Sequence, residues 1–153
     1  MSRGFGWSGI TIYALAMAFV EAACVISLKK LYYPEGWAPP FHPIPADALF
    51  LEQLREAATL VMIGAVSLLG RPPWREALAR GLWIFGIWDL AYYLFLLLWT
   101  GFPQSLFDWD VVFLIPKAWI APVWLPVAGS AVSLLLALRL HRAAARGRRT
   151  GGV

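Results

Sequence analysis

Four polar residues recur at helical spacing within an otherwise apolar stretch, FLEQLREAATLVMIGAVSLLG. They stand at positions i, i+3, i+4 and i+7: Glu52, Arg55, Glu56 and Thr59. This spacing puts all four on one face of a helix. Two carboxylates and a guanidinium on one face could hold a proton, a cation or a charged group of a ligand. We interpret this stripe as an inward-facing polar cluster.

Two further carboxylates lie inside apolar stretches without a cation nearby. Glu21 and Asp89 have no Lys or Arg within four residues. A charge at the centre of a bilayer costs about 2.5 to 3.5 kcal/mol on insertion scales, so such residues usually face the interior of a helix bundle. Tyr92 and Tyr93 follow Asp89 at i+3 and i+4, which predicts at least one tyrosine hydroxyl beside the same cavity.

The segment DWD places Asp108 and Asp110 two residues apart near the end of an apolar stretch. Aspartate is common at helix starts, so we expect this segment to cap a short helix at the outer boundary. Asp110 is also included among the candidate ligand-binding or proton-binding residues. These candidates are Glu21, Glu52, Arg55, Glu56, Asp89, Tyr92, Tyr93 and Asp110.

The elements that would position these residues are long apolar helices. Of the 153 residues, 60% are hydrophobic and 14% charged, and the mean hydropathy is +0.65. A soluble domain has about 25% charged residues. A membrane-spanning helix needs about 20 mostly apolar residues, and four windows qualify, at about 7–28, 48–69, 80–100 and 118–140. We predict an all-α fold, a single four-transmembrane-helix bundle.

The connections on one side of this bundle are unusual. LYYPEGWAPPFHPIPAD contains five prolines, so we expect a stiff outer loop that lies over the bundle as a lid or brace. The apolar segment VVFLIP is too short to span, and Pro116, Pro122 and Pro126 interrupt the chain that follows, which predicts a kink in the fourth span. We expect a short interfacial or re-entrant segment before the fourth helix.

Charge placement predicts the orientation, because cytoplasmic flanks carry an excess of Lys and Arg. With the N-terminus inside, nine arginines flank the inner ends and three lysines the outer ends. We expect a multi-pass cell-membrane protein with cytoplasmic termini and a basic tail at 141–153. The inner arginines are Arg3, Arg71, Arg75, Arg80, Arg139, Arg142, Arg146, Arg148 and Arg149, and the outer lysines are Lys29, Lys30 and Lys117.

The N-terminal segment has some features of a signal peptide, with Arg3 before an apolar stretch and EAAC after it. Glu21 and the apolar VISL beyond Cys24 favour its retention as the first span. Cys24 is the single cysteine, which excludes an intrachain disulfide and thiol-pair redox chemistry. The basic residues flank spans and are typical of topology signals, so we expect no nucleic-acid partner.

The sequence contains no glycine-rich phosphate loop, nucleophile elbow or His-Glu zinc helix. We therefore expect no cofactor and no resident metal. A lesser alternative is an oxygen-only site for a hard cation, made by Glu21, Glu56 and Asp89.

Two resemblances concern the carboxylates. Glu21 in the first of four short spans resembles the carboxylate with which small multidrug-resistance exporters exchange protons for cationic drugs. A compact bundle with buried carboxylates is similar to the sterol-isomerase and sigma-2-receptor group, which binds amine-like ligands. The exporters are shorter and lack the proline-rich loop and the Glu-x-x-Arg-Glu stripe, and the second likeness rests on no residue pattern. We therefore carry over no residue role and assign neither family.

The leading hypothesis is binding or transport of a small cationic or amphipathic ligand in a polar cavity open to the outer face. Glu21, Glu56 and Asp89 would be proton or cation sites, and Arg55 would hold one carboxylate ionised or meet an anionic group of the ligand. One alternative is an intramembrane enzyme that acts on a lipid or isoprenoid, with one carboxylate as acid and another as base. Another is an accessory subunit that pairs its polar stripe with a membrane partner or a second copy. In a purely structural alternative, Glu52 and Arg55 reach the headgroups, or Arg55 and Glu56 form an ion pair between packed helices.

Overall fold

The computed structural model describes residues 6–150, with side chains to residue 146, and is mostly helical. Four helices form in the four predicted windows, with ends that differ from those expected. Arg3, residues 151–153 of the basic tail and the side chains of Arg148 and Arg149 lie outside the described residues. The elements in chain order are α1 (Trp7–Tyr32), α2 (Ala46–Ser67), α3 (Trp74–Thr100), β1 (Trp109–Phe113), β2 (Trp119–Pro122) and α4 (Trp124–Thr150).

Proline and glycine set the helix boundaries. Pro45 and Pro73 directly precede α2 and α3, where proline fits because the first helical N–H groups have no partner within the helix. Helix α3 ends at Gly101, which adopts φ 74° and ψ 4°, the left-handed conformation that glycine adopts without steric cost. Helix α1 ends after Lys29 and Lys30, whose positive charges favour a helix C-terminus.

The segment expected as a short helix is instead an antiparallel β-hairpin. Strand β1 pairs with β2 in the register Asp110 to Ala121 and Val111 to Ile120, with an irregularity before Phe113. The predicted start of the fourth helix at 118 is therefore wrong, because α4 begins at Trp124. β-Branched residues favour the extended backbone, and strand pairing satisfies backbone groups that prolines would leave unpaired in a helix.

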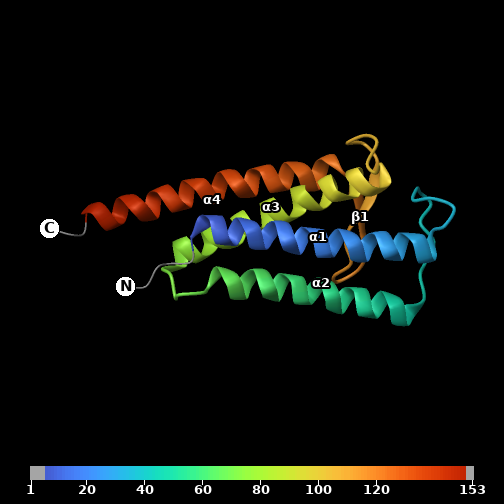
Figure 1. Ribbon diagram of the computed structural model, residues 1–153, viewed down its shortest axis with the longest axis horizontal. Helices are drawn as coiled ribbons and strands as arrows, with labels where there is room; N and C mark the ends of the chain where they lie inside the picture. The colour runs from blue at the N-terminus through green and yellow to red at the C-terminus, as the bar shows by residue number, and fades with distance from the viewer. Residues whose placement is uncertain (1–5, 151–153) are drawn as a thin grey trace.

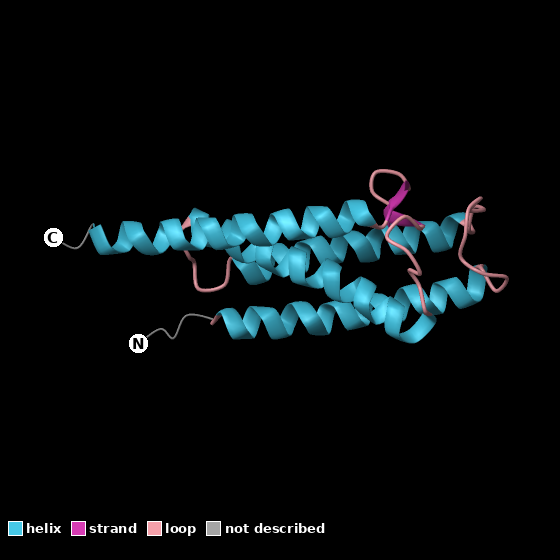
Figure 2. Cartoon of the chain, turned by 90° about the horizontal axis from the view of Figure 1, so that it is seen from above, coloured by secondary structure: helices cyan, strands magenta, loops and turns pink. Residues whose placement is uncertain are grey.

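Helix α3 is the central helix and packs against α1, α2 and α4. The four helices run along the long axis, so both ends of the chain lie at one end of the bundle, the terminal end (Figure 1). The hairpin and the 33–45 loop lie at the opposite end, the hairpin end (Figure 2). Two apolar cores follow one another along the bundle, the first around Ile10, Ile84 and Trp88 and the second around Leu96 and Val123.

Three helices are long and apolar enough to cross a membrane: Trp7–Tyr32, Trp74–Thr100 and Trp124–Arg146 of α4. This indicates a multi-pass membrane protein. Helix α2 has 22 residues but is not among the three, and it is the helix that carries Glu52, Arg55 and Glu56 in its first half.

Candidate functional site

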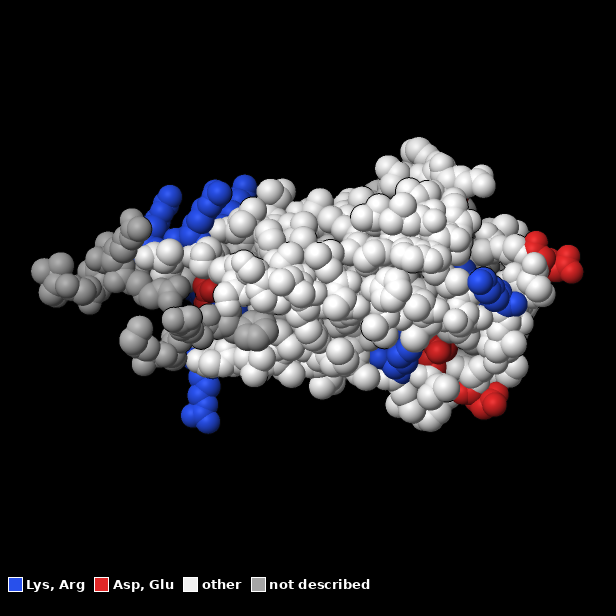
Figure 3. All heavy atoms as spheres, in the orientation of Figure 1, with Lys and Arg blue, Asp and Glu red and all other residues white. Residues whose placement is uncertain are grey.

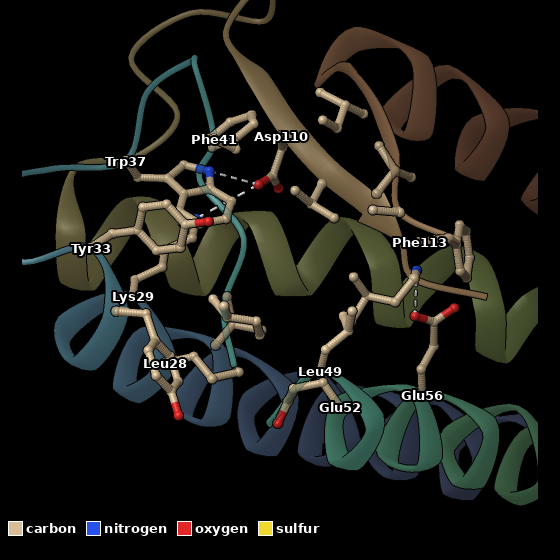
Figure 4. Close-up of a pocket in the computed structure, with 18 of the residues that line it drawn as sticks. Leu28, Lys29, Tyr33, Trp37, Phe41, Leu49, Glu52, Glu56, Asp110 and Phe113 are labelled. Carbon is tan, nitrogen blue, oxygen red and sulfur yellow. Dashed lines mark hydrogen bonds and ion pairs between the residues drawn. The ribbon is translucent and has the colours of Figure 1, made fainter. Parts of the chain in front are cut away.

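A cavity of about 400 Å³ lies between α1, α2 and α3 near the hairpin end. The hairpin and the 33–45 loop complete its wall (Figure 4). Residues from five separate segments therefore meet around one space. All eight candidate residues named from the sequence contribute to this wall: Glu21, Glu52, Arg55, Glu56, Asp89, Tyr92, Tyr93 and Asp110.

Arg55 of α2 bridges two carboxylates on two helices. Its guanidinium contacts Glu21 of α1 through Nη1, and Glu52 through Nη2 at 2.6 Å and Nε at 2.7 Å. The three side chains are 12–23% exposed, so they face inward. Arg55 thus pairs with one carboxylate of its own helix and one of α1. The expected ion pair between Arg55 and Glu56 does not form among the described residues.

Glu56 holds the hairpin. One carboxylate oxygen, Oε2, accepts a hydrogen bond of 2.7 Å from the backbone N–H of Leu114. Gln53, one turn earlier on α2, donates from Nε2 to the carbonyl of the same residue at 3.1 Å. The second oxygen, Glu56 Oε1, is buried and has no hydrogen-bond partner among the described residues. The Glu56 side chain therefore keeps one acceptor beside the cavity.

Asp110 is the most buried acidic residue of the site, with 1% of its surface exposed. It accepts hydrogen bonds from Trp37 Nε1 at 2.9 Å and from the Tyr93 hydroxyl at 3.2 Å. Lys29 Nζ lies 3.7 Å from its Oδ1. Burial raises the pKa of the Asp110 carboxyl above its usual value, against the opposing effect of Lys29 and the hydrogen bonds. The expected helix cap is wrong for this residue, because Asp110 lies in β1 and its side chain points into the bundle.

Asp89 marks the end of the cavity nearest the middle of the bundle. Its Oδ2 accepts a hydrogen bond of 2.7 Å from the Ser130 hydroxyl of α4. Tyr92, at i+3 from Asp89, lies on the same wall. Trp88 also lines the cavity, and its indole Nε1 is buried without a hydrogen-bond partner among the described residues. A donor and several acceptors thus face a space whose walls are otherwise mostly aromatic and aliphatic.

Aromatic residues of the proline-rich segment roof the cavity. The Tyr33 ring lies 4.6 Å from that of Trp37 and stacks on His42 at 4.2 Å, and Trp37 lies 4.6 Å from Phe41. The Tyr33 hydroxyl donates to the His42 carbonyl at 2.5 Å. These contacts fold the segment back over α1, so rings of the loop cover the hairpin end of the cavity.

Several residues of the site are not identified by the sequence alone. Charge placement assigns Lys29 to the topology signals, although it stands at i+8 from Glu21 and therefore shares its helix face. Gln53 and Ser130 are neutral side chains whose partners are distant in the sequence. Trp37 lies where an interfacial tryptophan is expected, and its contact with Asp110 depends on how the loop and the hairpin fold.

Within the described part of the chain, no group of three or more His, Cys, Asp or Glu side chains lies close enough to hold a metal ion. The oxygen-only cation site of Glu21, Glu56 and Asp89 therefore has no support in the geometry. Comparison with known proteins gives no match: no family model, no curated protein and no solved structure is significantly similar to this chain. The chemistry of the cavity is thus the basis for a functional assignment.

Proposed function

We propose that the cavity binds a small amphipathic cation inside a four-span membrane protein. The observation that carries this proposal is the balance of charge in the wall, where five carboxyl groups face two cationic side chains. The carboxyl groups are Glu21, Glu52, Glu56, Asp89 and Asp110, and the cations are Lys29 and Arg55. This excess of carboxyl groups over cationic side chains favours a positively charged ligand group, because the surrounding apolar walls screen charges less than water does.

The apolar walls support an amphipathic ligand over a simple inorganic ion. Val25, Leu28 and Leu49 line the cavity together with the aromatic rings, so a hydrocarbon body would lose contact with water on entry. A volume of about 400 Å³ lies within the range of pockets for small organic molecules. Glu56 Oε1, which has no partner among the described residues, offers an acceptor for the positive group.

The surface of α2 supports its insertion as a fourth span. Beyond Asp47 at its exposed start, its charged side chains face the cavity, whereas its exposed large side chains are apolar. These exposed residues include Phe50, Leu51, Leu54, Leu60, Val61 and Met62, each at least 42% exposed. A helix of this kind can face lipid while its charges remain inside the bundle.

The distribution of basic residues supports cytoplasmic termini. Most of the basic side chains seen in Figure 3 lie near the terminal end, whereas acidic side chains are prominent near the hairpin end, where basic side chains also lie. Exposed arginines near the terminal end include Arg71, Arg75, Arg139, Arg142 and Arg146. We therefore propose that the hairpin end faces outward, with the cavity in the outer half of the membrane.

The binding proposal is tested by calorimetric titration of the protein in lipid nanodiscs, with empty nanodiscs as the reference for partitioning. Three probes share one eight-carbon chain: octyltrimethylammonium, octanol and octyl sulfate. We expect saturable binding of the cation and no saturable binding of the neutral or anionic probe. Equal binding of all three would contradict the charge argument.

Two matched variants locate the binding site. Glu56→Gln removes the charge but keeps an oxygen that can accept from Leu114, and it should weaken binding of octyltrimethylammonium about tenfold, or about 1.4 kcal/mol. Asp47→Asn removes a carboxylate from the exposed start of α2 and should leave binding unchanged. An equal loss in both variants would indicate a surface effect and not binding in the cavity.

A further inference from the structure

The ammonium group of Lys29 lies in a pocket made by other parts of the chain. Its Nζ atom is 4.3 Å from the ring centroid of Trp37 and 4.1 Å from that of Phe102. The Asp110 carboxylate lies 3.7 Å away. Two aromatic faces and a carboxylate are the groups that proteins use to bind alkylammonium ligands. The geometry is therefore that of a receptor for an ammonium group.

Lys29 is held in this pocket without directional bonds. Its Nζ is buried and has no hydrogen-bond partner among the described residues, although an ammonium group has three donors. Contacts with ring faces and a charge at 3.7 Å remain when the ammonium carries methyl groups in place of hydrogens. The pocket therefore suits a methylated ammonium as well as a primary one.

The pocket does not depend on Lys29 for its shape. Trp37 and Tyr93 donate hydrogen bonds to Asp110, so the carboxylate keeps two partners if the lysine moves away. These two bonds join the loop, α3 and the hairpin around the carboxylate. Removal of Lys29 would therefore leave the pocket formed, with the Asp110 carboxyl group still held by Trp37 and Tyr93.

A second cavity beside Lys29 could accept its side chain after displacement. This cavity of about 730 Å³ lies at the hairpin end, between the end of α1, the 33–39 segment and the 100–109 segment. Lys29 lines both cavities, as do Tyr33 and Trp37. The second cavity also contains Asp108, a carboxylate that could face a displaced ammonium. Lys29 thus stands between an inner and an outer space.

We infer that the pocket of Trp37, Phe102 and Asp110 is an ammonium-binding subsite that Lys29 occupies in the absence of ligand. A ligand with a primary or methylated ammonium group would displace the lysine into the outer cavity and take its place. The statement that this ligand is the one bound in the inner cavity rests on the proposed function. The existence of the subsite does not depend on the proposed function, and small probes test it separately.

The first test is chemical rescue of Lys29→Ala. This variant leaves the pocket open and should be less thermally stable than the wild type. Butylammonium chloride should raise its melting temperature by several degrees more than equal concentrations of sodium chloride or butanol. Lys30→Ala, at the neighbouring position, and the wild type should show a clearly smaller extra gain, because Lys29 competes with the amine for the pocket. Lys29→Ala/Asp110→Asn should show no extra gain, because it lacks the carboxylate.

Absence of amine rescue, or equal rescue in the double variant, would overturn the subsite. A variant that folds in detergent only when butylammonium is present would count as rescue. A variant that stays unfolded with the amine would count against the proposal.

The second test uses the wild type and measures displacement directly. Amine acetylation is followed by mass spectrometry, with Lys30 as the internal reference. Butyltrimethylammonium, which has no reactive N–H, should raise the labelling of Lys29 severalfold relative to Lys30. Unchanged or reduced labelling would show that the lysine stays in place and would overturn the inference.

These outcomes are distinguishable from a failure of the proposed function. If octyltrimethylammonium does not bind in the inner cavity but Lys29→Ala is rescued, the subsite stands and the broader binding proposal falls. If octyltrimethylammonium binds in a Glu56-dependent way but neither rescue nor extra labelling occurs, the binding proposal stands and Lys29 is a structural ion-pair partner.

Discussion

Glu56 and the backbone of Leu114 are joined by a hydrogen bond of 2.7 Å, although 58 residues separate them. Gln53 bonds the carbonyl of the same residue, so α2 satisfies both backbone groups of Leu114. A buried backbone group without a partner costs free energy comparable to a lost hydrogen bond. The polar stripe of α2 therefore anchors the hairpin as well as facing the cavity.

Two replacements of Glu56 should separate its role as the anchor of the hairpin from the effect of its negative charge. Glu56→Leu removes the acceptor and leaves the Leu114 N–H buried, so we expect a loss of about 1 to 3 kcal/mol in unfolding free energy. Glu56→Gln retains an acceptor and should lose less. Thermal unfolding in detergent and amide hydrogen exchange across 111–118 measure the two effects. Equal stability and equal protection in both variants would exclude the anchoring role.

The sequence predicted the helices well and the hairpin badly, for a physical reason. Long apolar runs bounded by proline, glycine and charge specify helices locally, and all four are present. The segment VVFLIP is apolar without a decisive period, so a short helix and a strand are hard to distinguish from it. Its conformation is determined by pairing with β2 and by contact with α2, which no local pattern encodes.

In the site, too, the residues that follow a local sequence pattern were predicted, whereas contacts between distant segments were not. Helical spacing alone put Glu52, Arg55 and Glu56 on one face, and the structure has them on the wall of one cavity. Lys29 escapes this kind of reasoning because a lysine near a helix end is typical of a membrane boundary. Its contact with Asp110 forms because the fold brings β1 close to the end of α1.

Arg55 is the cation that balances two carboxylates, so its removal should be costly. Arg55→Met leaves Glu21 and Glu52 without their partner, and we expect a loss of up to about 3 kcal/mol in unfolding free energy. This is the lower end of the range for buried pairs, since the Arg55 side chain is 23% exposed. Arg55→Met/Glu21→Gln/Glu52→Gln should recover most of the loss. A triple variant as unstable as the single one would mean that Arg55 acts through packing and not through charge.

Asp110 should make stability depend on pH in a defined direction. Its pKa in the folded state is raised by burial, so the protonated carboxyl favours folding. This contribution is fully present below the ordinary aspartate pKa of about 3.9 and is lost as the pH rises through the raised value. The melting temperature of the wild type relative to Asp110→Asn should therefore fall as the pH increases from about 4 towards 7. A relative gain over this interval would mean that Lys29 and the hydrogen bonds outweigh burial.

Gly86 sets the distance between α3 and α4. A Cβ atom at this position would lie 2.7 Å from Leu134 Cγ and 3.0 Å from the backbone oxygen of Ser130. Leu134 could adjust, but the backbone of α4 must shift, and Ser130 is also the donor to Asp89. We expect Gly86→Ala to lower the unfolding free energy by about 1 to 3 kcal/mol and to weaken octyltrimethylammonium binding, because a shifted Ser130 would no longer hold Asp89 in place.

A matched glycine on α2 provides the control. A Cβ atom at Gly64 would meet nothing within 4 Å, and alanine is the better helix former, so Gly64→Ala should gain up to about 1 kcal/mol. Thermal unfolding of the two variants in the same detergent separates the effect of the close contact between α3 and α4 from the effect of helix propensity on stability. If Gly86→Ala were as stable as Gly64→Ala, α3 and α4 would not need their close approach, and the position of Ser130 beside Asp89 would not depend on it.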